Sequence, residues 1–327
     1  MTTTTQNVPG KTMAKSGLMK YLDEYSLILI FLALFALLSF SVEYFFSLDN
    51  MIGLALSVSQ IGMVACTMMF CLASRDFDLS IGSTVAFAGV LCAMVINQSG
   101  SIVIGVAVSL LAGAAIGFIN GVVIAKLRVN ALITTLATME MVRGLAFIAS
   151  GGQAVGVSNT AFFTIGNTMI LGIPSPVWIT ILCFVVFGVM LNKTVYGRNT
   201  LAVGGNPSAS RLAGVGVEKT RIYIFLIQGV IAALAGIILA SRITSGQPNS
   251  AQGFELNVIS ACVLGGVSLM GGRATISGVI VGVLIMGTVQ NAMNLLNIDA
   301  FYQYLVRGGI LLTAVLIDQL KQREEND

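Results

Sequence analysis

Residues 193–221 read KTVYGRNTLAVGGNPSASRLAGVGVEKTR and form the one long polar stretch between two halves of the chain that are otherwise almost entirely apolar. Three residues in this stretch predict a short helix. Asn206 can accept hydrogen bonds from the first free N–H groups, Pro207 suits the first helical position, and Gly214 can adopt the left-handed conformation that follows a helix end. The pattern therefore predicts a helix of roughly two turns over residues 207–213.

A helix of this length is marginal on its own, so it needs a partner surface to be stable. Ala209, Leu212 and Ala213 are spaced to form one apolar face, which favours docking against another protein. The alternative is a solvated loop that only connects two membrane-spanning helices. The residues of the stretch alone leave both interpretations open.

The composition places the rest of the chain in a membrane. Hydrophobic residues make up 56% of the 327 residues and charged residues 9%, whereas ordinary soluble domains carry about 25% charged residues. Apolar runs long enough to cross a hydrocarbon core of about 30 Å recur along the whole length. The sequence therefore predicts an all-α membrane protein, a polytopic bundle of about ten transmembrane helices.

The expected spans follow the apolar runs, and those at 81–97 and 256–270 are near the short limit for a span. The full set is 26–42, 51–72, 81–97, 101–124, 131–149, 176–192, 222–242, 256–270, 275–297 and 302–318. With both termini in the cytoplasm, all Lys and Arg residues except Arg143, Arg242 and Arg307 fall on the cytoplasmic side, which is 14 of 17.

This arrangement divides the chain into three parts. A cytoplasmic N-terminal tail (1–25) precedes the transmembrane region (26–318), and a cytoplasmic C-terminal tail (319–327) follows it. The polar stretch 193–221 lies inside the transmembrane region as a cytoplasmic loop.

Polar interruptions stand at matching places in the two halves. Residues 74–83 follow the second span and residues 243–254 follow the seventh, so the halves are candidates for an inverted repeat of five spans each, with the interruptions on opposite faces. Broken helices at membrane depth are tolerated where the backbone lines a cavity, which makes both interruptions candidate parts of a transport pathway. In the span 101–124, glycines at every fourth position from Gly113 to Gly121 predict the close approach of another helix.

Polar and charged residues in or beside the spans are the candidates for lining that pathway. They are Asp76, Asp78, Ser80, Asn130, Thr134, Thr135, Glu140, Arg143, Glu255, Asn291 and Asn294. Glu140 and Arg143 are three residues apart and share a helix face, so they are either a buried structural ion pair or groups that contact a substrate.

Several function classes are disfavoured. The chain has no histidine and no GxxxxGK[ST] loop, and its five cysteines all lie in apolar runs, so we expect no metal ion, no cofactor, no disulfide framework and no ATP site of the Walker type. Asp76 and Asp78 do not share a helical face, which argues against an intramembrane enzyme. A proton-coupled carrier stays open because buried acids could relay protons, and so does a structural membrane protein. A permease driven by a separate motor would use residues 193–221 for docking.

Ordered blocks of the sequence resemble the sugar permeases of bacterial ATP-binding-cassette (ABC) importers, the ribose, galactose and arabinose group, over about residues 20–320. The blocks are RDFDLSIGS at 75–83, NGVVIAKLRVNALITTLATMEMVRG at 120–144, YGRNTLAVGGNPSASRLAGV at 196–215, KTRIYIFLIQGVIAALAGIILASR at 219–242 and ELNVISACVLGGVSLMGGRATISG at 255–278. Within the group, CLASRDFDLS, LASRITSGQP and NAMNLLNI look most like the L-arabinose permeases. Two departures are Arg75, where many relatives have Gly, and GGRATISG at 271–278 in place of GGxGxIxG.

The resemblance implies a type II importer fold in the bacterial inner membrane. It implies a homodimer with the pathway at its centre, a periplasmic sugar-binding protein outside, a small sugar as substrate, lipid around the bundle and no nucleic acid. An ATPase subunit would dock on the loop. The implied coupling residues are Gly197, Arg198, Gly204, Gly205, Asn206, Ala209, Arg211, Leu212 and Gly214.

Overall fold

The computed structural model describes the backbone of residues 17–326 and the side chains of residues 26–320. Residues 1–16 of the predicted N-terminal tail, with Lys11 and Lys15, lie outside the described residues. The predicted C-terminal tail is helical as far as Asn326, because the last helix continues to that residue.

Each predicted span corresponds to a helix. The helices are α1 (Gly17–Ser41), α2 (Leu48–Ala73), α3 (Ile81–Ser99), α4 (Ile102–Ala125), α5 (Ala131–Ser150), α7 (Ser175–Lys193), α10 (Val217–Arg242), α11 (Phe254–Leu264), α12 (Ile276–Leu295) and α13 (Ala300–Asn326). In the part of the chain that the structure describes, eight of them are long and apolar enough to cross a membrane. The apolar part of α1, Ser26–Ser41, and α11 are shorter.

The prediction of a full span at 256–270 is wrong at its second end. Helix α11 ends at Leu264, and Gly266 follows with a φ of 79°, a left-handed conformation that glycine adopts without strain. At about 1.5 Å per residue, an 11-residue helix reaches only about half of a hydrocarbon core. Helix α11 is therefore a half-length helix inside the bundle.

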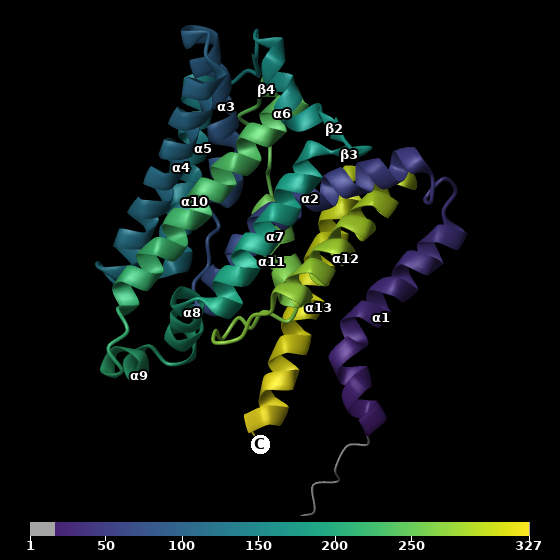
Figure 1. Ribbon diagram of the computed structural model, residues 1–327, viewed down its shortest axis with the longest axis vertical. Helices are drawn as coiled ribbons and strands as arrows, with labels where there is room; N and C mark the ends of the chain where they lie inside the picture. Colours follow the sequence, from purple (N-terminus) through teal and green to yellow (C-terminus); the bar gives the residue numbers. More distant parts are fainter. Residues whose placement is uncertain (1–16, 327) are drawn as a thin grey trace, which may run out of the picture.

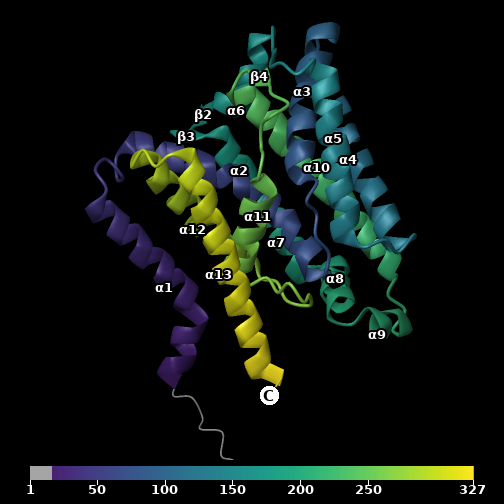
Figure 2. The ribbon, with the colours of Figure 1, turned by 180° about the vertical axis from the view of Figure 1, so that it is seen from behind.

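Short elements occupy the two ends of the bundle. At one end lie β1 (Val155–Gly156), η1 (Thr160–Phe163), α6 (Thr164–Asn167), β2 (Met169–Ile170), β3 (Ile173–Pro174) and β4 (Ser245–Gly246). Strand β1 pairs antiparallel with β4, and β2 pairs antiparallel with β3. At the other end lie α8 (Val195–Gly205) and α9 (Pro207–Leu212), together with the first turn of α1 and the end of α13 (Figures 1 and 2).

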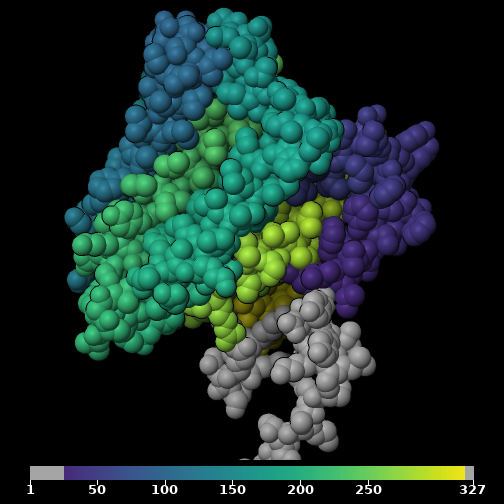
Figure 3. Space-filling view, in the orientation of Figure 1, coloured from purple at the N-terminus to yellow at the C-terminus, as the bar shows by residue number. Residues whose placement is uncertain are grey.

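Helix α2 forms the centre of the bundle. Every residue from Ile61 to Ala73 is buried, and α2 packs against α7, α10, α11 and α12. Helices α3, α4 and α5 lie to one side of this centre, and α12, α13 and α1 lie to the other (Figures 1 and 2). Helix α1 runs along the outer edge beside α12, where the space-filling view shows it at the border of the molecule (Figure 3).

The glycine ladder in α4 makes the predicted close approach, and its partner is α10. A Cβ atom at Gly113 would overlap the carbonyl oxygen of Gly229, and one at Gly117 would overlap that of Phe225. At Gly121 a Cβ would press on the Cα atom of Ile222. Because only hydrogen atoms separate the two backbones, α4 of the first half and α10 of the second half form one tight pair.

Candidate functional site

The polar stretch 193–221 folds into two helices where the sequence predicted one. Asn206 caps α9 as predicted, accepting from the N–H groups of Ser208 at 3.1 Å and Ala209 at 3.0 Å. Gly214 follows with a φ of 83°. The additional helix, α8, is capped by the Thr194 hydroxyl, which accepts from the N–H of Gly197 at 3.2 Å. Helix α8 contains three glycines, and glycine is a poor helix former, so helix propensity does not predict it.

The implied coupling residues divide into two groups. Gly197 and Gly204 are buried, and a Cβ atom at Gly204 would overlap the carbonyl oxygen of Ala73 at the end of α2. The exposed group comprises Arg198, Gly205, Asn206, Ala209, Arg211, Leu212 and Gly214. Leu212 is 92% exposed, and an apolar side chain in that position is available to a partner.

Between α2 and α3 the chain is non-helical over residues 74–80, which we call the first break. Its second residue, Arg75, is a non-glycine residue at a φ of 65°, a conformation that costs about 1–2 kcal/mol. The Arg75 guanidinium donates from Nη2 to the carbonyl oxygen of Gly205 at 3.0 Å and from Nε to that of Met270. The N–H of Gly272 donates to the carbonyl oxygen of Ala73 at 2.8 Å. The first break is thus joined to the α8–α9 segment and to the loop before α12.

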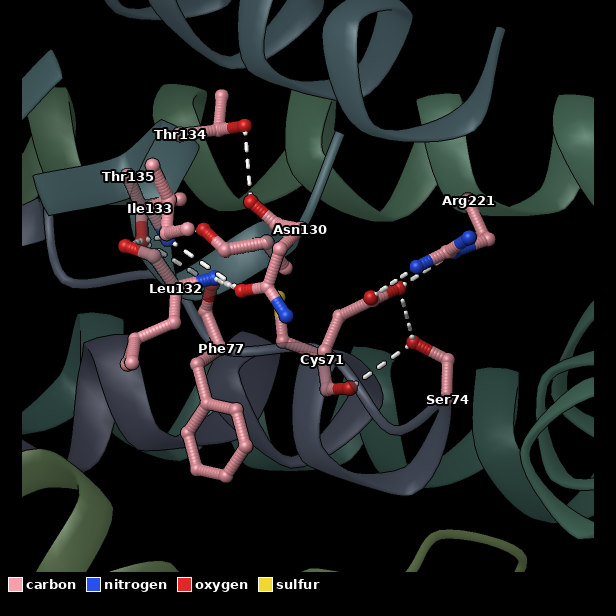
Figure 4. A network of polar contacts seen from close by, with 11 residues as sticks. Cys71, Ser74, Phe77, Asn130, Leu132, Ile133, Thr134, Thr135 and Arg221 are labelled. Atoms are coloured by element: carbon pink, nitrogen blue, oxygen red, sulfur yellow. Dashed lines mark hydrogen bonds and ion pairs between the residues drawn. The ribbon is translucent and has the colours of Figure 1, made fainter. Parts of the chain in front are cut away.

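Asp76 forms a two-pronged ion pair with Arg221 of α10 (Figure 4). Arg221 donates from Nε to Asp76 Oδ2 at 2.6 Å and from Nη2 to Oδ1, and the Ser74 hydroxyl donates to Oδ2 at 3.4 Å. The Asp76 side chain is 1% exposed. Burial raises the pKa of Asp76, and the hydrogen bonds and charge of Arg221 oppose that rise.

Asp78 starts a chain of buried hydrogen bonds through three elements. Its Oδ1 accepts from the Ser80 N–H at 2.9 Å and from the Ser80 hydroxyl at 2.6 Å. Asn120 of α4 donates to the Ser80 hydroxyl at 3.0 Å, and its side-chain oxygen accepts from the Thr138 hydroxyl of α5 at 2.6 Å. Burial raises the pKa of Asp78 to about 6, against the hydrogen bonds from Ser80. Asn120 and Thr138 are not among the predicted site residues: Asn120 is an isolated polar residue in an apolar helix, and nothing in the sequence distinguishes Thr138 from the neighbouring threonines.

The predicted residues at the start of α5 have local roles. Asn130 caps α5 by accepting from the N–H groups of Leu132 and Ile133, and Thr134 donates to the Asn130 carbonyl oxygen (Figure 4). Thr135 donates at 3.3 Å to the carbonyl oxygen of Phe77. Of these residues, Thr135 therefore connects α5 with the first break.

A second break, residues 243–253, links α10 to α11 and enters the bundle from the opposite end. Arg143 of α5 holds it by donating to the carbonyl oxygens of Pro248 and Ser250, each at 2.7 Å. Among the described residues Arg143 forms no ion pair with Glu140, so the interpretation as a buried pair is wrong. Glu140 instead lies exposed at the middle of α5.

Inside the bundle, the second break meets the first turn of α3, directly after the first break. A Cβ atom at Gly82, at the start of α3, would overlap both the carbonyl oxygen of Ala251 and the carboxylate of Glu255. Ser83 follows Gly82 directly in the sequence, and Asn257 lies two residues after Glu255. The Ser83 hydroxyl and the side-chain oxygen of Asn257 are buried and have no described hydrogen-bond partner. Unpaired buried polar atoms at the junction of two broken helices are suited to hydrogen-bonding a polar solute.

Asn291 and Asn294 stand apart from the other predicted pathway residues. Asn291 exchanges two hydrogen bonds with Asn50 of α2, at 2.8 Å and 3.0 Å, and Asn294 accepts from Gln303 at 3.1 Å. These pairs join α12 to α2 and α13. The structure brings neither residue to the breaks.

A cavity of about 740 Å³ opens beside the first break. Arg75, Asp76 and Arg221 line one side of it. Arg128, from the α4–α5 turn, and Arg211, from α9, also line it. Its walls thus combine α9 and the first break with the ends of α4, α5 and α10.

Apolar helices of membrane-spanning length, two broken segments that meet inside the bundle and an exposed helical segment at one end define a membrane protein of the transporter class. The chain belongs to the family of branched-chain amino acid transport system permease components, whose model matches residues 50–315. The prediction of a permease component rather than an enzyme is thereby confirmed.

Curated relatives match almost the full length of the chain. It is 56% identical over 301 residues to the L-arabinose transport system permease protein AraH of Escherichia coli (strain K12), covering 92% of each chain. It is 54% identical to the L-arabinose ABC transporter permease protein AraH of Azospirillum brasilense, covering 95% of this chain and 92% of that protein. Its identity to the ribose import permease protein RbsC of E. coli (strain K12) is 38%, over 98% of this chain and 100% of that one. No solved structure matches the chain.

Proposed function

We propose that this chain is the membrane-spanning subunit of an ABC importer that carries L-arabinose into a bacterial cell across the inner membrane. The observation that carries the proposal is the gradient of identity among relatives: 56% and 54% to permeases named for L-arabinose, against 38% to one named for ribose. All three comparisons span nine-tenths of the chain or more, so the three identities refer to nearly the same residues.

Energy for transport would enter through the α8–α9 segment. This segment stands out from one end of the bundle, and its exposed residues include the apolar Leu212 and the cationic Arg198 and Arg211. An ATPase subunit with an apolar groove and acidic rim would fit it. The buried Gly197 and Gly204 would serve coupling by letting α8 pack closely on the rest of the permease. With this end in the cytoplasm, the first turn of α1 and the end of α13 also lie there.

The sugar would pass where the two breaks meet. Arg143 and Glu255 lie on the side of the second break, and the unpaired Ser83 hydroxyl lies at the start of α3, after the first break. A neutral pentose is recognised by such groups through its hydroxyls. Outside the cell, a periplasmic binding protein would deliver the sugar.

A second copy of the chain would complete the pathway. Glu140 is exposed halfway along a membrane-spanning helix, and a carboxylate facing lipid at that depth is strongly unfavourable. The face of α5 that carries Glu140 is therefore better suited to a water-filled path at the interface of a homodimer than to lipid.

The test is uptake by proteoliposomes that hold the permease with its ATPase and binding protein. Arg211→Glu should abolish ATP-dependent L-arabinose uptake while the permease remains inserted, because the charge reversal opposes docking. Lys126→Glu, a charge reversal on the exposed α4–α5 turn, is the matched control and should retain uptake. If the permease alone takes up sugar in response to a pH gradient, it is a proton-coupled carrier and the proposal is wrong.

A further inference from the structure

Arg75 combines two features that a solvated surface arginine lacks. Its backbone has a φ of 65°. Its side chain is exposed, so burial of the side chain does not explain this strained conformation. Its guanidinium is engaged with two main-chain carbonyl oxygens, those of Gly205 and Met270, and with no carboxylate among the described residues. A strained backbone position held by hydrogen bonds to other segments points to a role in positioning those segments.

The two carbonyl groups belong to segments far apart in the sequence. Gly205 is the last residue of α8, directly before the Asn206 cap of α9. Met270 lies in the loop between α11 and α12. These segments touch the end of α2 backbone to backbone, since a Cβ atom at Gly204 would overlap the Ala73 carbonyl oxygen and Gly272 donates to the same oxygen.

The residues that follow Arg75 connect the same break to three long helices. Asp76 is paired with Arg221 of α10. The Phe77 carbonyl oxygen accepts from Thr135 of α5, and Asp78 reaches α4 through Ser80 and Asn120. Movement of the first break would therefore displace the ends of α4, α5 and α10 together.

We propose that Arg75 is a positioning residue that transmits movement of the α8–α9 segment to the first break, and through it to α4, α5 and α10. The inference rests on the proposed function, in which α8 and α9 receive the movement of an ATPase. The movement is transmitted by the two hydrogen bonds from one guanidinium to the carbonyl oxygens of Gly205 and Met270. Because the guanidinium is rigid and planar, it holds the two acceptors at a fixed distance from each other. The α8–α9 segment and the break then move together.

The deciding variant is Arg75→Gly, which removes the guanidinium and at the same time relieves the left-handed backbone conformation. In proteoliposomes with the ATPase and binding protein, sugar uptake and ATP hydrolysis are measured together. We expect the ATPase to co-purify with the variant, the melting temperature to be unchanged or raised, and the sugar imported per ATP hydrolysed to fall roughly tenfold, within the range of mutations that alter coupling. Arg75→Lys, whose single ammonium group cannot hold both carbonyls, should give an intermediate ratio.

Arg128→Ala is the matched control. Arg128 is also exposed, lies at a φ of 57° and lines the same cavity, but it makes no described hydrogen bond to another segment. Its variant should keep the wild-type ratio. A wild-type ratio in Arg75→Gly would overturn the inference, and so would loss of ATPase binding, which would make Arg75 a docking residue. If the wild-type permease itself shows no ATP-dependent uptake, the proposed function fails instead.

Discussion

Replacing Arg221 with alanine should destabilise the protein, and the loss should depend on pH. The Asp76 carboxylate is 1% exposed and the Arg221 side chain 27% exposed, so the variant leaves a buried charge without its counter-charge. Removing one partner of a buried ion pair costs about 3–5 kcal/mol, and the partial exposure of Arg221 places this pair at the lower end, about 3 kcal/mol near neutral pH.

Protonation of Asp76 sets an upper limit on this loss. An unfolded aspartate has a pKa of about 3.9, and each pH unit above it adds about 1.4 kcal/mol to the free energy of protonation. The limit on the charge-burial part is therefore about 4 kcal/mol at pH 7 and about 1.5 kcal/mol at pH 5. In the variant the folded-state pKa of Asp76 lies above the unfolded value. The destabilisation consequently grows as pH rises from about 4 and shrinks as pH falls.

The measurement is the free energy of unfolding in mixed micelles at both pH values, followed by the fluorescence of the single tryptophan, Trp178. Adding Asp76→Asn to Arg221→Ala should recover much of the stability near neutral pH, because the buried group is then uncharged. Arg128→Ala, an exposed arginine without a described ion pair, is the control. Equal destabilisation at both pH values, or additive losses in the double variant, would refute the reasoning.

Four further predictions concern packing and buried polar groups. Gly117→Val should lower the free energy of unfolding by at least about 1–3 kcal/mol, because the added side chain pushes α4 away from α10. Gly144 has open space around it, so Gly144→Ala should stabilise α5 by about 0.5–1 kcal/mol in the same assay. Because burial raises the pKa of Asp78 to about 6, the wild type should lose up to about 3 kcal/mol as pH rises from about 4 to about 6, and Asp78→Asn should lack this fall in a pH series. Asn120→Leu should cost about 1–3 kcal/mol by leaving the buried Thr138 hydroxyl unpaired, and an added Thr138→Val should reverse part of that loss in a double-mutant cycle.

The sequence was sufficient to predict the elements whose signals are local. Apolar runs predicted the membrane helices, the Asn206, Pro207 and Gly214 pattern predicted α9, and the four-residue glycine spacing predicted a close helix contact. Each of these signals depends on residues a few positions apart. The inverted repeat of five spans in each half remains a prediction, although the two breaks do enter the bundle from opposite ends.

The features that escaped prediction depend on contacts across long stretches of sequence. Helix α8 contains three glycines and is stabilised by packing on α2, so propensity alone argues against it. The identity of α10 as the partner of α4 is not encoded in the glycine spacing of α4. Asn120 is an isolated polar residue in the apolar helix α4, and Asn291 stands among the polar residues at the end of α12. Only the structure separates the one that reaches the first break from the one that pairs with Asn50.

The pairing of α4 with α10 also has a consequence for biosynthesis. Helix α4 leaves the ribosome well before α10, so its glycine face enters the bilayer without the surface that will cover it. A nascent chain that stops before residue 217 exposes that groove to lipid and to quality-control proteases. The second half of the chain is therefore needed to cover the glycine face of α4 in the first half. Premature termination should yield rapidly degraded fragments rather than a stable half-permease.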